Sequence, residues 1–274
     1  MLSVIIPASN EAAYIGPCLV ALFASDPVPG GAEAVVVANG CHDATADVAR
    51  ACGPLAEAAG WRLRVLELGQ GSKPAALNAG DTAALGEMRA YLDADVRVSP
   101  ALMAQVVAVL LRDAPTYTSG TPQIPRARSA VTRAYARFWQ KLPFAQSPAP
   151  GYGLFAVNAA GRARWGAFPG IISDDTFVRL HFAPQDRISC PARYEWPMIE
   201  GFGRLVRVRR RQDAGVAEIA HTCPDLLAHE AKARLGVGAV AGLAIRDPLG
   251  FAVYAAVSAA VRMGRGTGGW SRGR

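Results

Sequence analysis

The chain of 274 residues has few cysteines, few lysines and no long uninterrupted apolar segment. Its five cysteines are scattered and form neither a C-x-x-C pair nor a zinc-ligand spacing. A disulfide framework and a structural zinc site are therefore not expected, and a reducing cytoplasm fits best. The N-terminal segment has no basic region before its short apolar run, so we expect no signal peptide. No stretch reaches the roughly 20 apolar residues of a membrane-spanning helix, so we expect no integral membrane protein.

The charge is distributed unevenly along the chain. Lys and Arg number 29 against 22 Asp and Glu, which gives a net charge of +7. Residues 1–110 hold 6 basic and 11 acidic side chains (net −5), and residues 111–274 hold 23 and 11 (net +12). A basic half is typical of proteins that bind phosphate-bearing ligands, an anionic membrane surface or nucleic acid. Because only three basic residues are Lys, an Arg excess from a G+C-rich genome explains the charge equally well. No basic platform interleaved with aromatic residues is present, so we expect no nucleic-acid partner.

The first 100 residues alternate short apolar, β-branched runs with segments of helical periodicity. Strands are predicted at 3–7, 34–38, 62–68 and 90–93, and helices at 11–23, 45–59 and 73–86. This alternation predicts βαβ units in an α/β fold with a mostly parallel sheet. Ligands of such sheets bind beyond the carboxyl ends of the strands. Most of the polar clusters in this half of the sequence fall at such ends.

The second half is predicted to continue the same domain. Helices are expected at 102–112, 129–140 and 176–182, strands at 116–124 and 153–157, a long loop at 142–152, and short β segments with turns at 184–211. We expect one catalytic domain over 1–224, with halves 1–100 and 101–224, followed by a helical, partly apolar tail over 225–274. Within the tail, residues 235–263 form two apolar pieces edged by basic residues. They predict a peripheral contact with the inner face of the membrane, a helix pair packed on the domain, or a dimer contact.

Two carboxylates follow the fourth predicted strand, in the segment Asp93-Ala94-Asp95. Their mutual repulsion in a semi-buried place is costly unless a cation lies near them. Oxygen ligands of this kind suit Mg²⁺ or Mn²⁺, which bind one or two carboxylates together with substrate phosphates. A lone pair of this spacing is also common in turns and at helix starts.

Four motifs occur in a fixed order: PASNE at 7–11, NGCHDAT at 39–45, KPAALNAG at 73–80 and YLDAD at 91–95. In this order the sequence resembles the family-2 glycosyltransferases, inverting enzymes that use nucleotide-diphosphate sugars. The resemblance is close over residues 2–100 and looser over 150–215. It implies a GT-A type, Rossmann-like fold, in which a mixed, mostly parallel sheet is flanked by helices. It also implies a role in cell-envelope glycan or glycolipid synthesis.

The resemblance implies a set of donor-binding residues. Pro7, Ala8 and Glu11 correspond to the first nucleoside-contacting loop, and Lys73 to a contact with the nucleotide or its phosphates. Asn39 stands where the family usually has Asp for the base. An amide both donates and accepts hydrogen bonds, whereas an ionised carboxylate only accepts. The base therefore stays open, with uridine preferred and guanosine second.

Other interpretations of the donor-side residues stay open. Asn10 and Glu11 could cap the first helix. Asp43 and Thr45 are predicted to build a turn rather than to contact a ligand.

The resemblance also implies a metal site that uses Mn²⁺ or Mg²⁺. Asp95 would be the main ligand, Asp93 would contact the metal or the ribose, and His221 is a candidate for a further ligand. The ion would bridge both phosphates and stabilise the departing nucleotide diphosphate. A single histidine is more often an ordinary core or surface residue, and His221 is open to that interpretation as well.

On the acceptor side, Asp175 corresponds to the family's catalytic base, and Asp174 replaces the more usual Glu before it. One carboxylate must deprotonate the acceptor hydroxyl as it attacks the anomeric carbon. Carboxylates at a helix start also stabilise the helix dipole, so a structural role stays open. Tyr152, Trp165 and the loop near Phe168 are expected to shape the acceptor pocket.

The basic run 204–211 corresponds loosely to a mobile loop that carries a Q-x-x-R-W signature in processive relatives. The run has no Trp, which predicts a non-processive hexosyl- or related transferase. Arg209 is a candidate for clamping the pyrophosphate, although a run of charges is also typical of a solvated surface.

The resemblance predicts a metal-dependent inverting glycosyltransferase that moves a sugar from a UDP-sugar to an acceptor, either a free sugar or a lipid-linked one. The alternative is a non-catalytic nucleotide-sugar or carbohydrate-binding protein of the same fold. Such a protein would be expected to have lost Asp95 or Asp175, and both are present. A nucleotidyltransferase would have a Gly-rich first loop with a basic residue, and residues 7–11 have neither.

Overall fold

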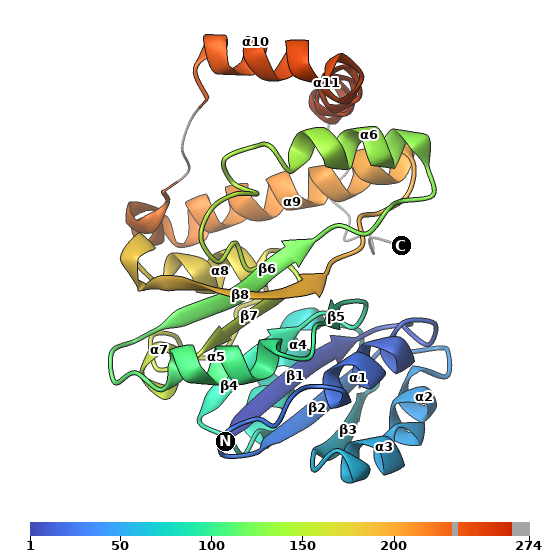
Figure 1. The fold of residues 1–274 in the computed structure, drawn as a ribbon, viewed down its shortest axis with the longest axis vertical. Coiled ribbons are helices and arrows are strands. Elements are labelled where there is room, and N and C mark those ends of the chain that lie inside the picture. Colours follow the sequence, from blue (N-terminus) through green and yellow to red (C-terminus); the bar gives the residue numbers. More distant parts are fainter. Residues whose placement is uncertain (232–234, 265–274) are drawn as a thin grey trace.

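The structure, a computed structural model, describes residues 1–231 and 235–264 of the chain (Figure 1). Their centre is an eight-stranded mixed sheet with the order β3-β2-β1-β4-β7-β6-β8-β5. The strands are β1 (Leu2–Ala8), β2 (Ala32–Asn39), β3 (Arg62–Leu68), β4 (Met88–Leu92), β5 (Arg97–Val98), β6 (Tyr117–Gln123), β7 (Leu154–Val157) and β8 (Arg187–Glu195). The pairs β1–β2, β2–β3, β1–β4 and β6–β8 are parallel, and β7 runs antiparallel to both β4 and β6. The predicted α/β class is confirmed.

Helices cover both faces of the sheet, and a further layer of helices lies beyond its upper end in Figure 1. They are α1 (Ile15–Phe23), α2 (Thr45–Ala51), α3 (Gly53–Ala58), α4 (Lys73–Ala83), α5 (Leu102–Leu110), α6 (Ala130–Trp139), α7 (Ala159–Arg162), α8 (Asp174–Leu180), α9 (Phe202–Thr222), α10 (Val237–Arg246) and α11 (Pro248–Met263). Two short 3-10 turns, η1 (Pro184–Asp186) and η2 (Pro224–His229), follow α8 and α9.

The central strands are buried on both faces, which is why they form near-continuous apolar runs. Along β1, Val4 and Ile6 pack in one core cluster with residues of α1 and α5. Ile5, which points to the opposite face, packs with Leu77 of α4 and with residues of β7 and α8. The alternation along β1 therefore builds one core on each face of the sheet. These two cores hold the strand in place, and so set where its polar C-terminal end lies.

Two segments differ from the sequence-based prediction. The helix expected over 45–59 is divided into α2 and α3, because Gly53 and Pro54 follow Cys52 and a proline amide cannot continue the hydrogen-bond ladder. The basic run 204–211, expected among β segments and turns, lies within the 21-residue helix α9. Leu205 and Val206 of this run are buried, and this packing, together with the good helix propensity of Arg, favours helix over loop.

The two tail helices pack differently. Val257 of α11 is fully buried with Tyr135 of α6 and with Leu205 and Val206 of α9. Helix α10 has no buried residue and lies against α11 at the top of Figure 1. Within residues 1–231 and 235–264, no helix combines the length and the apolar character needed to cross a membrane.

Candidate active site

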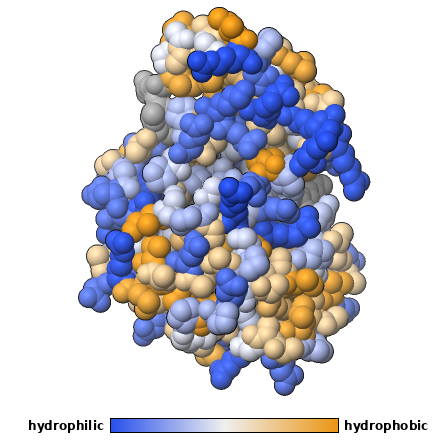
Figure 2. All heavy atoms as spheres, in the orientation of Figure 1, coloured by the Kyte–Doolittle hydropathy of each residue, from blue (hydrophilic) through white to orange (hydrophobic). Residues whose placement is uncertain are grey.

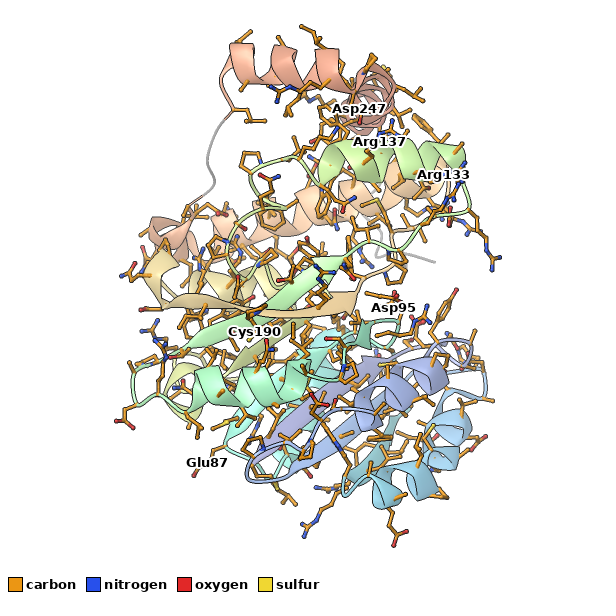
Figure 3. All side chains as sticks on the ribbon, in the orientation of Figure 1. Glu87, Asp95, Arg133, Arg137, Cys190 and Asp247 are labelled. Carbon is orange, nitrogen blue, oxygen red and sulfur yellow. The ribbon has the colours of Figure 1, made fainter. Side chains whose placement is uncertain are left out.

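A cleft with a volume of about 470 Å³ opens where the carboxyl ends of β1, β2 and β4 face the layer of α6 and α9. The strand order makes β1 a switch point, because β2 and β3 lie on one side of it and β4 on the other. Ligands of open α/β sheets bind at such a point. Asp95, labelled in Figure 3, lies at the level where the end of the sheet faces these helices.

Four aspartates and one lysine line the cleft. Asp93 and Asp95 come from the end of β4, and Asp174 and Asp175 from the first turn of α8. The Nζ of Lys73 lies 3.0 Å from Oδ1 of Asp93 and 3.0 Å from Oδ1 of Asp174. The sequence-predicted acids from the two halves of the chain are thus brought to one place.

The position of Lys73 follows from local sequence. It is the first residue of α4, and Ser72 caps this helix by accepting a hydrogen bond from the Ala75 amide at 3.3 Å. Pro74 in the first turn is preorganised for a helix start. The cap fixes where the helix begins, and so directs the lysine toward the end of β4.

Electrostatics of the group favour a bound cation or a positively charged partner. Burial, followed by repulsion from Asp175 and Asp93, raises the pKa of Asp174 to about 6 in spite of the Lys73 ammonium. Burial opposes the charge of Lys73, but Asp174, Asp93 and Asp175 outweigh it and raise the lysine pKa above its usual range. Lys73 therefore stays charged, and one ammonium faces more carboxylates than it can neutralise.

The donor set fits a divalent ion only together with a ligand. Within the described parts of the chain, no group of three or more His, Cys, Asp and Glu is arranged to hold a metal. Asp93 and Asp95 supply two carboxylates at one strand end. Mg²⁺ and Mn²⁺ typically take one or two carboxylates and complete their coordination with phosphate oxygens and water. His221, the third ligand candidate, is exposed in the last turn of α9 and is not among the residues that line the cleft.

The first loop is built largely through backbone groups. Pro7 and Glu11 line the cleft, whereas Ala8 is buried and contributes its carbonyl oxygen to the Asn39 amide. Asp43 and Thr45, which were predicted to build the turn after β2, also hold this first loop. Thr45 Oγ1 accepts a hydrogen bond from the Glu11 amide at 2.8 Å, and Asp43 Oδ2 accepts one from the Ala12 amide at 3.1 Å.

Asn39 lines the cleft, but its side chain is held by the backbone. Its Nδ2 donates to the carbonyl of Ala8 at 2.9 Å and to that of Val37 at 3.3 Å. Its Oδ1 accepts from the amide of Ser72 at 3.0 Å. The residue joins the ends of β1 and β2 to the start of α4, which requires a group that both donates and accepts. This accounts for an amide at position 39, where the resemblance implies Asp.

Sequence reasoning named Tyr152 as a pocket residue but missed the two tryptophans beside it. Tyr152, Trp139 of α6 and Trp196 after β8 all line the cleft. The Tyr152 ring centroid lies 4.7 Å from that of Trp196 and 5.4 Å from that of Trp139. Gly153 has φ of 77°, and a Cβ at this position would collide with the Trp196 ring. No short motif marks the two tryptophans, because their proximity arises from segments far apart in sequence.

Two residues expected to shape the pocket do not reach it. Trp165 and Phe168 are 7% and 3% exposed and pack in the core cluster behind α8. Neither side chain lines the cleft, so the expectation for Trp165 is wrong, whereas the loop near Phe168 does reach the cleft through Ile171 and Ile172.

Arg209 reaches the cleft from a helix instead of a mobile loop. Its Nε donates to Asp213 Oδ1 at 3.0 Å, and its Nη1 lies 3.3 Å from the Tyr135 hydroxyl and 3.4 Å from that of Tyr254. It therefore links α6, α9 and α11. Arg211 also lines the cleft, whereas Arg204, Arg207 and Arg210 are exposed.

Comparisons with known proteins agree on the fold. The sequence profile described as "Glycosyl transferase family 2" matches residues 3–163. A comparison with curated protein sequences gives no significant match. Among solved structures, a mannosyltransferase of Pyrobaculum calidifontis, in complex with GDP-Man and Mn²⁺, has a TM-score of 0.59 and 21% identity over 96% of this chain and 76% of that chain.

Two further structures are similar over most of the chain. TarS residues 1–349 of S. aureus, in complex with UDP, gives a TM-score of 0.54 and 14% identity over 96% of this chain and 92% of that one. Glucosyl-3-phosphoglycerate synthase of M. tuberculosis gives 0.51 and 18% identity over 82% and 81%. At these identities the likeness concerns the fold, and it confirms the predicted GT-A type architecture.

Proposed function

Because the chain belongs to glycosyl transferase family 2, we propose that it is a metal-dependent, inverting and non-processive glycosyltransferase. It would move a sugar from a UDP-sugar to an acceptor hydroxyl, with Asp175 as general base. The observation that carries the proposal is that four aspartates line the cleft at the switch point of the sheet, two of them paired with Lys73. Three of the similar solved structures support a nucleotide-sugar donor, since they contain GDP-Man, UDP or UDP-GlcNAc.

The donor would lie with its nucleoside against the loop of Pro7 and Glu11 and its diphosphate near Lys73. The ammonium of Lys73, already beside Asp93, is placed at the entry of α4, where a phosphate oxygen would gain from the positive charge. Arg209 would approach the diphosphate from the opposite wall. We keep uridine as the preferred base and test guanosine beside it.

Asp95 would be the main ligand of Mn²⁺ or Mg²⁺, with Asp93 as the second. When bound there, the ion would supply Lewis-acid stabilisation of the departing nucleotide diphosphate.

Asp175 is the better candidate for the base because Asp174 is already engaged. Asp174 is 5% exposed and bound to Lys73, and the salt bridges found in the cleft among the described residues do not include Asp175. Asp175 would take the proton of the acceptor hydroxyl while the new oxygen–carbon bond forms and the bond to the diphosphate breaks. Asp174 would hold Lys73 in place, and Lys73 would in turn position the phosphates.

The aromatic group of Tyr152, Trp139 and Trp196 offers flat apolar faces beside the carboxylates. A sugar ring exposes C–H groups on its faces and hydroxyls at its edge, so it can stack on such rings while its hydroxyl points to Asp175. This arrangement supports a carbohydrate or a carbohydrate-bearing molecule as the acceptor.

Calorimetric titration of UDP and of GDP, with and without Mn²⁺, tests the donor site. We expect metal-dependent binding of UDP that Asp95→Ala abolishes and that exposed Asp113→Asn, a matched acidic control, leaves unchanged. If folded protein binds neither nucleotide, the donor assignment is wrong and the non-catalytic alternative gains weight.

A second measurement concerns the base. Asp175→Asn should keep UDP binding and lose about 10²- to 10⁴-fold in turnover, as loss of a general base does. Release of UDP from UDP-sugars in the presence of candidate acceptors reports this turnover. A variant as active as the unmodified enzyme would exclude Asp175 as the base.

A further inference from the structure

We propose that α10 and the exposed surface of α11 form an anchor that lies in the interface of an anionic lipid bilayer. This inference concerns a surface outside the cleft and does not depend on the transferase reaction. It rests on the composition, exposure and charge of the two helices.

Helix α10 is apolar and unburied at the same time. Its ten residues, VGAVAGLAIR, contain one polar side chain, Arg246 at the C-terminal end, and none of the ten is buried. Val237 is 89% exposed, and Ile245, two turns further on, is 81% exposed. Leu249 continues this surface into α11 with 62%. Figure 2 shows hydrophobic atoms gathered at the upper edge of the molecule, where Figure 1 places α10 and α11.

A lipid surface fits α10 better than a protein partner does. Protein interfaces have a polar rim and about one hydrogen bond per 100–200 Å². Apart from Arg246, the side chains of α10 offer no donor or acceptor to such a rim. A helix in a bilayer interface needs only an apolar surface to insert and basic groups at the level of the headgroups.

The charges of the two helices have the sign that anionic headgroups attract. The stretch 235–264 contains Arg246, Asp247 and Arg262 as its charged residues. Both arginines are exposed, while Asp247 is 5% exposed and bound by Arg137 and Lys141 of the neighbouring α6 segment. The acid is thus neutralised within the protein, and the charge that the stretch presents to the outside is positive.

The anchor is joined firmly to the cleft. Asp247 caps α11 by accepting a hydrogen bond from the Gly250 amide at 3.0 Å and holds it to α6 through Arg137, as Figure 3 shows for the labelled pair. Tyr254 of α11 contacts Arg209, which lines the cleft. Binding of the two helices to a bilayer would therefore set the acceptor-side wall of α6 and α9 close to the membrane.

Vesicle flotation with the full chain tests the proposal. We expect binding to vesicles of phosphatidylcholine with phosphatidylglycerol, weaker binding to phosphatidylcholine alone, and release as salt rises toward about 1 M, where charges are screened within ~3 Å. Replacement of Arg246 and Arg262 by Gln should weaken binding about 25-fold, since each basic residue near an anionic surface contributes about fivefold.

The apolar contribution has a matched control. The triple variant Val237→Ser, Ile245→Ser and Leu249→Ser should lose at least about tenfold in binding. The control triple Val20→Ser, Leu85→Ser and Leu111→Ser changes residues that are 51%, 57% and 67% exposed but lie outside α10 and α11, and it should bind like the unmodified chain. Circular dichroism and UDP titration show that each variant is folded.

Three results would overturn the proposal. One is that the unmodified chain does not bind anionic vesicles. Another is that the triple variant of Val237, Ile245 and Leu249 binds them as well as the control triple does. The third is that light scattering shows the unmodified chain as a dimer and this triple variant as a monomer, because the apolar face would then be covered by a second copy of the chain. Loss of UDP binding with vesicle binding intact would count against the donor site alone.

Discussion

Replacement of Asn39 by Asp tests the interpretation of this position most directly. The substitution introduces the residue that the resemblance implies at this position and changes the side chain by one polar group. In the structure, the Asn39 amide nitrogen donates to the carbonyl oxygens of Ala8 and Val37, and the residue is 3% exposed. An ionised Asp would instead turn a second oxygen toward these two carbonyls.

The cost depends on the protonation of the new carboxyl. Loss of a buried hydrogen bond that leaves its partner unsatisfied costs about 1–3 kcal/mol. In its protonated form, the carboxyl introduced by Asn39→Asp would still donate to Ala8 and accept from Ser72, so at low pH the variant should be nearly as stable as the unmodified protein. At high pH, ionisation against two carbonyls should bring the loss to about 3 kcal/mol.

The sign of the pH dependence follows from linkage. Burial and the facing carbonyls favour the neutral form, so the pKa of the new carboxyl should be raised above its unfolded value of about 3.9. The folded state then binds more protons than the unfolded state between the two pKa values. Stability of the variant relative to the unmodified protein must therefore fall as pH rises from about 4 through the folded pKa, and level off above it.

Urea unfolding of both proteins between about pH 4 and pH 8 measures this difference. Asn10→Asp is the matched control, because the Asn10 side chain accepts from the His42 amide and its position is partly exposed, so a carboxylate serves there as well. We expect that control to change stability by less than about 0.5 kcal/mol. A gap for Asn39→Asp that is absent, or that does not change with pH, would refute the role assigned to the amide.

Two further changes probe the ion pairs that the structure shows. Lys73→Met should lower the free energy of unfolding by about 2 kcal/mol at pH 8 and by less near pH 5. The reason is that loss of the cation raises the pKa of Asp174 above about 6, and the neutral carboxyl is tolerated in its buried place. Urea unfolding that shows an equal loss at both pH values would contradict this. Asp247→Asn should lower the free energy of unfolding by about 2 kcal/mol at pH 7. Arg137 holds the Asp247 pKa below its usual range, so this stabilisation of the unmodified protein is lost as pH falls through that pKa, and thermal unfolding should show the difference between the two proteins closing in acid. A difference that persists at low pH would contradict this.

The sheet could be predicted because its central strands are specified locally. The strands expected over 3–7 and 34–38 lie within the central strands β1 and β2, and the one expected over 62–68 coincides with β3, an edge strand that is only partly buried. Strands buried on both faces are near-continuous apolar runs, which a sequence displays directly. The gathering of Asp93, Asp174 and Lys73 could be anticipated once the motifs were assigned to the ends of parallel strands and starts of helices.

The remaining features depend on contacts between distant segments. Trp139 and Trp196 lie 57 positions apart in the printed sequence, and their ring centroids lie 5.9 Å apart in the cleft. The helical state of the basic run 204–211 depends on Leu205 and Val206 packing with Val257, a residue of the tail. The Asn39 amide is fixed by carbonyl groups of two strands, which no residue pattern reveals.

The uneven charge of the sequence acquires a structural explanation in the cleft. Residues 1–110, with a net charge of −5, supply Asp93 and Asp95, and residues 111–274, with +12, supply Arg209 and Arg211 on the opposite wall. The halves are not uniform, because Lys73 crosses from the acidic half to meet Asp174 of the basic one. A diphosphate with its cation carries both signs of charge and could be neutralised from both walls at once, which an all-basic or all-acidic cleft could not do. The exposed arginines of the same run do not line the cleft, so composition alone overstated the number of basic residues available to a ligand.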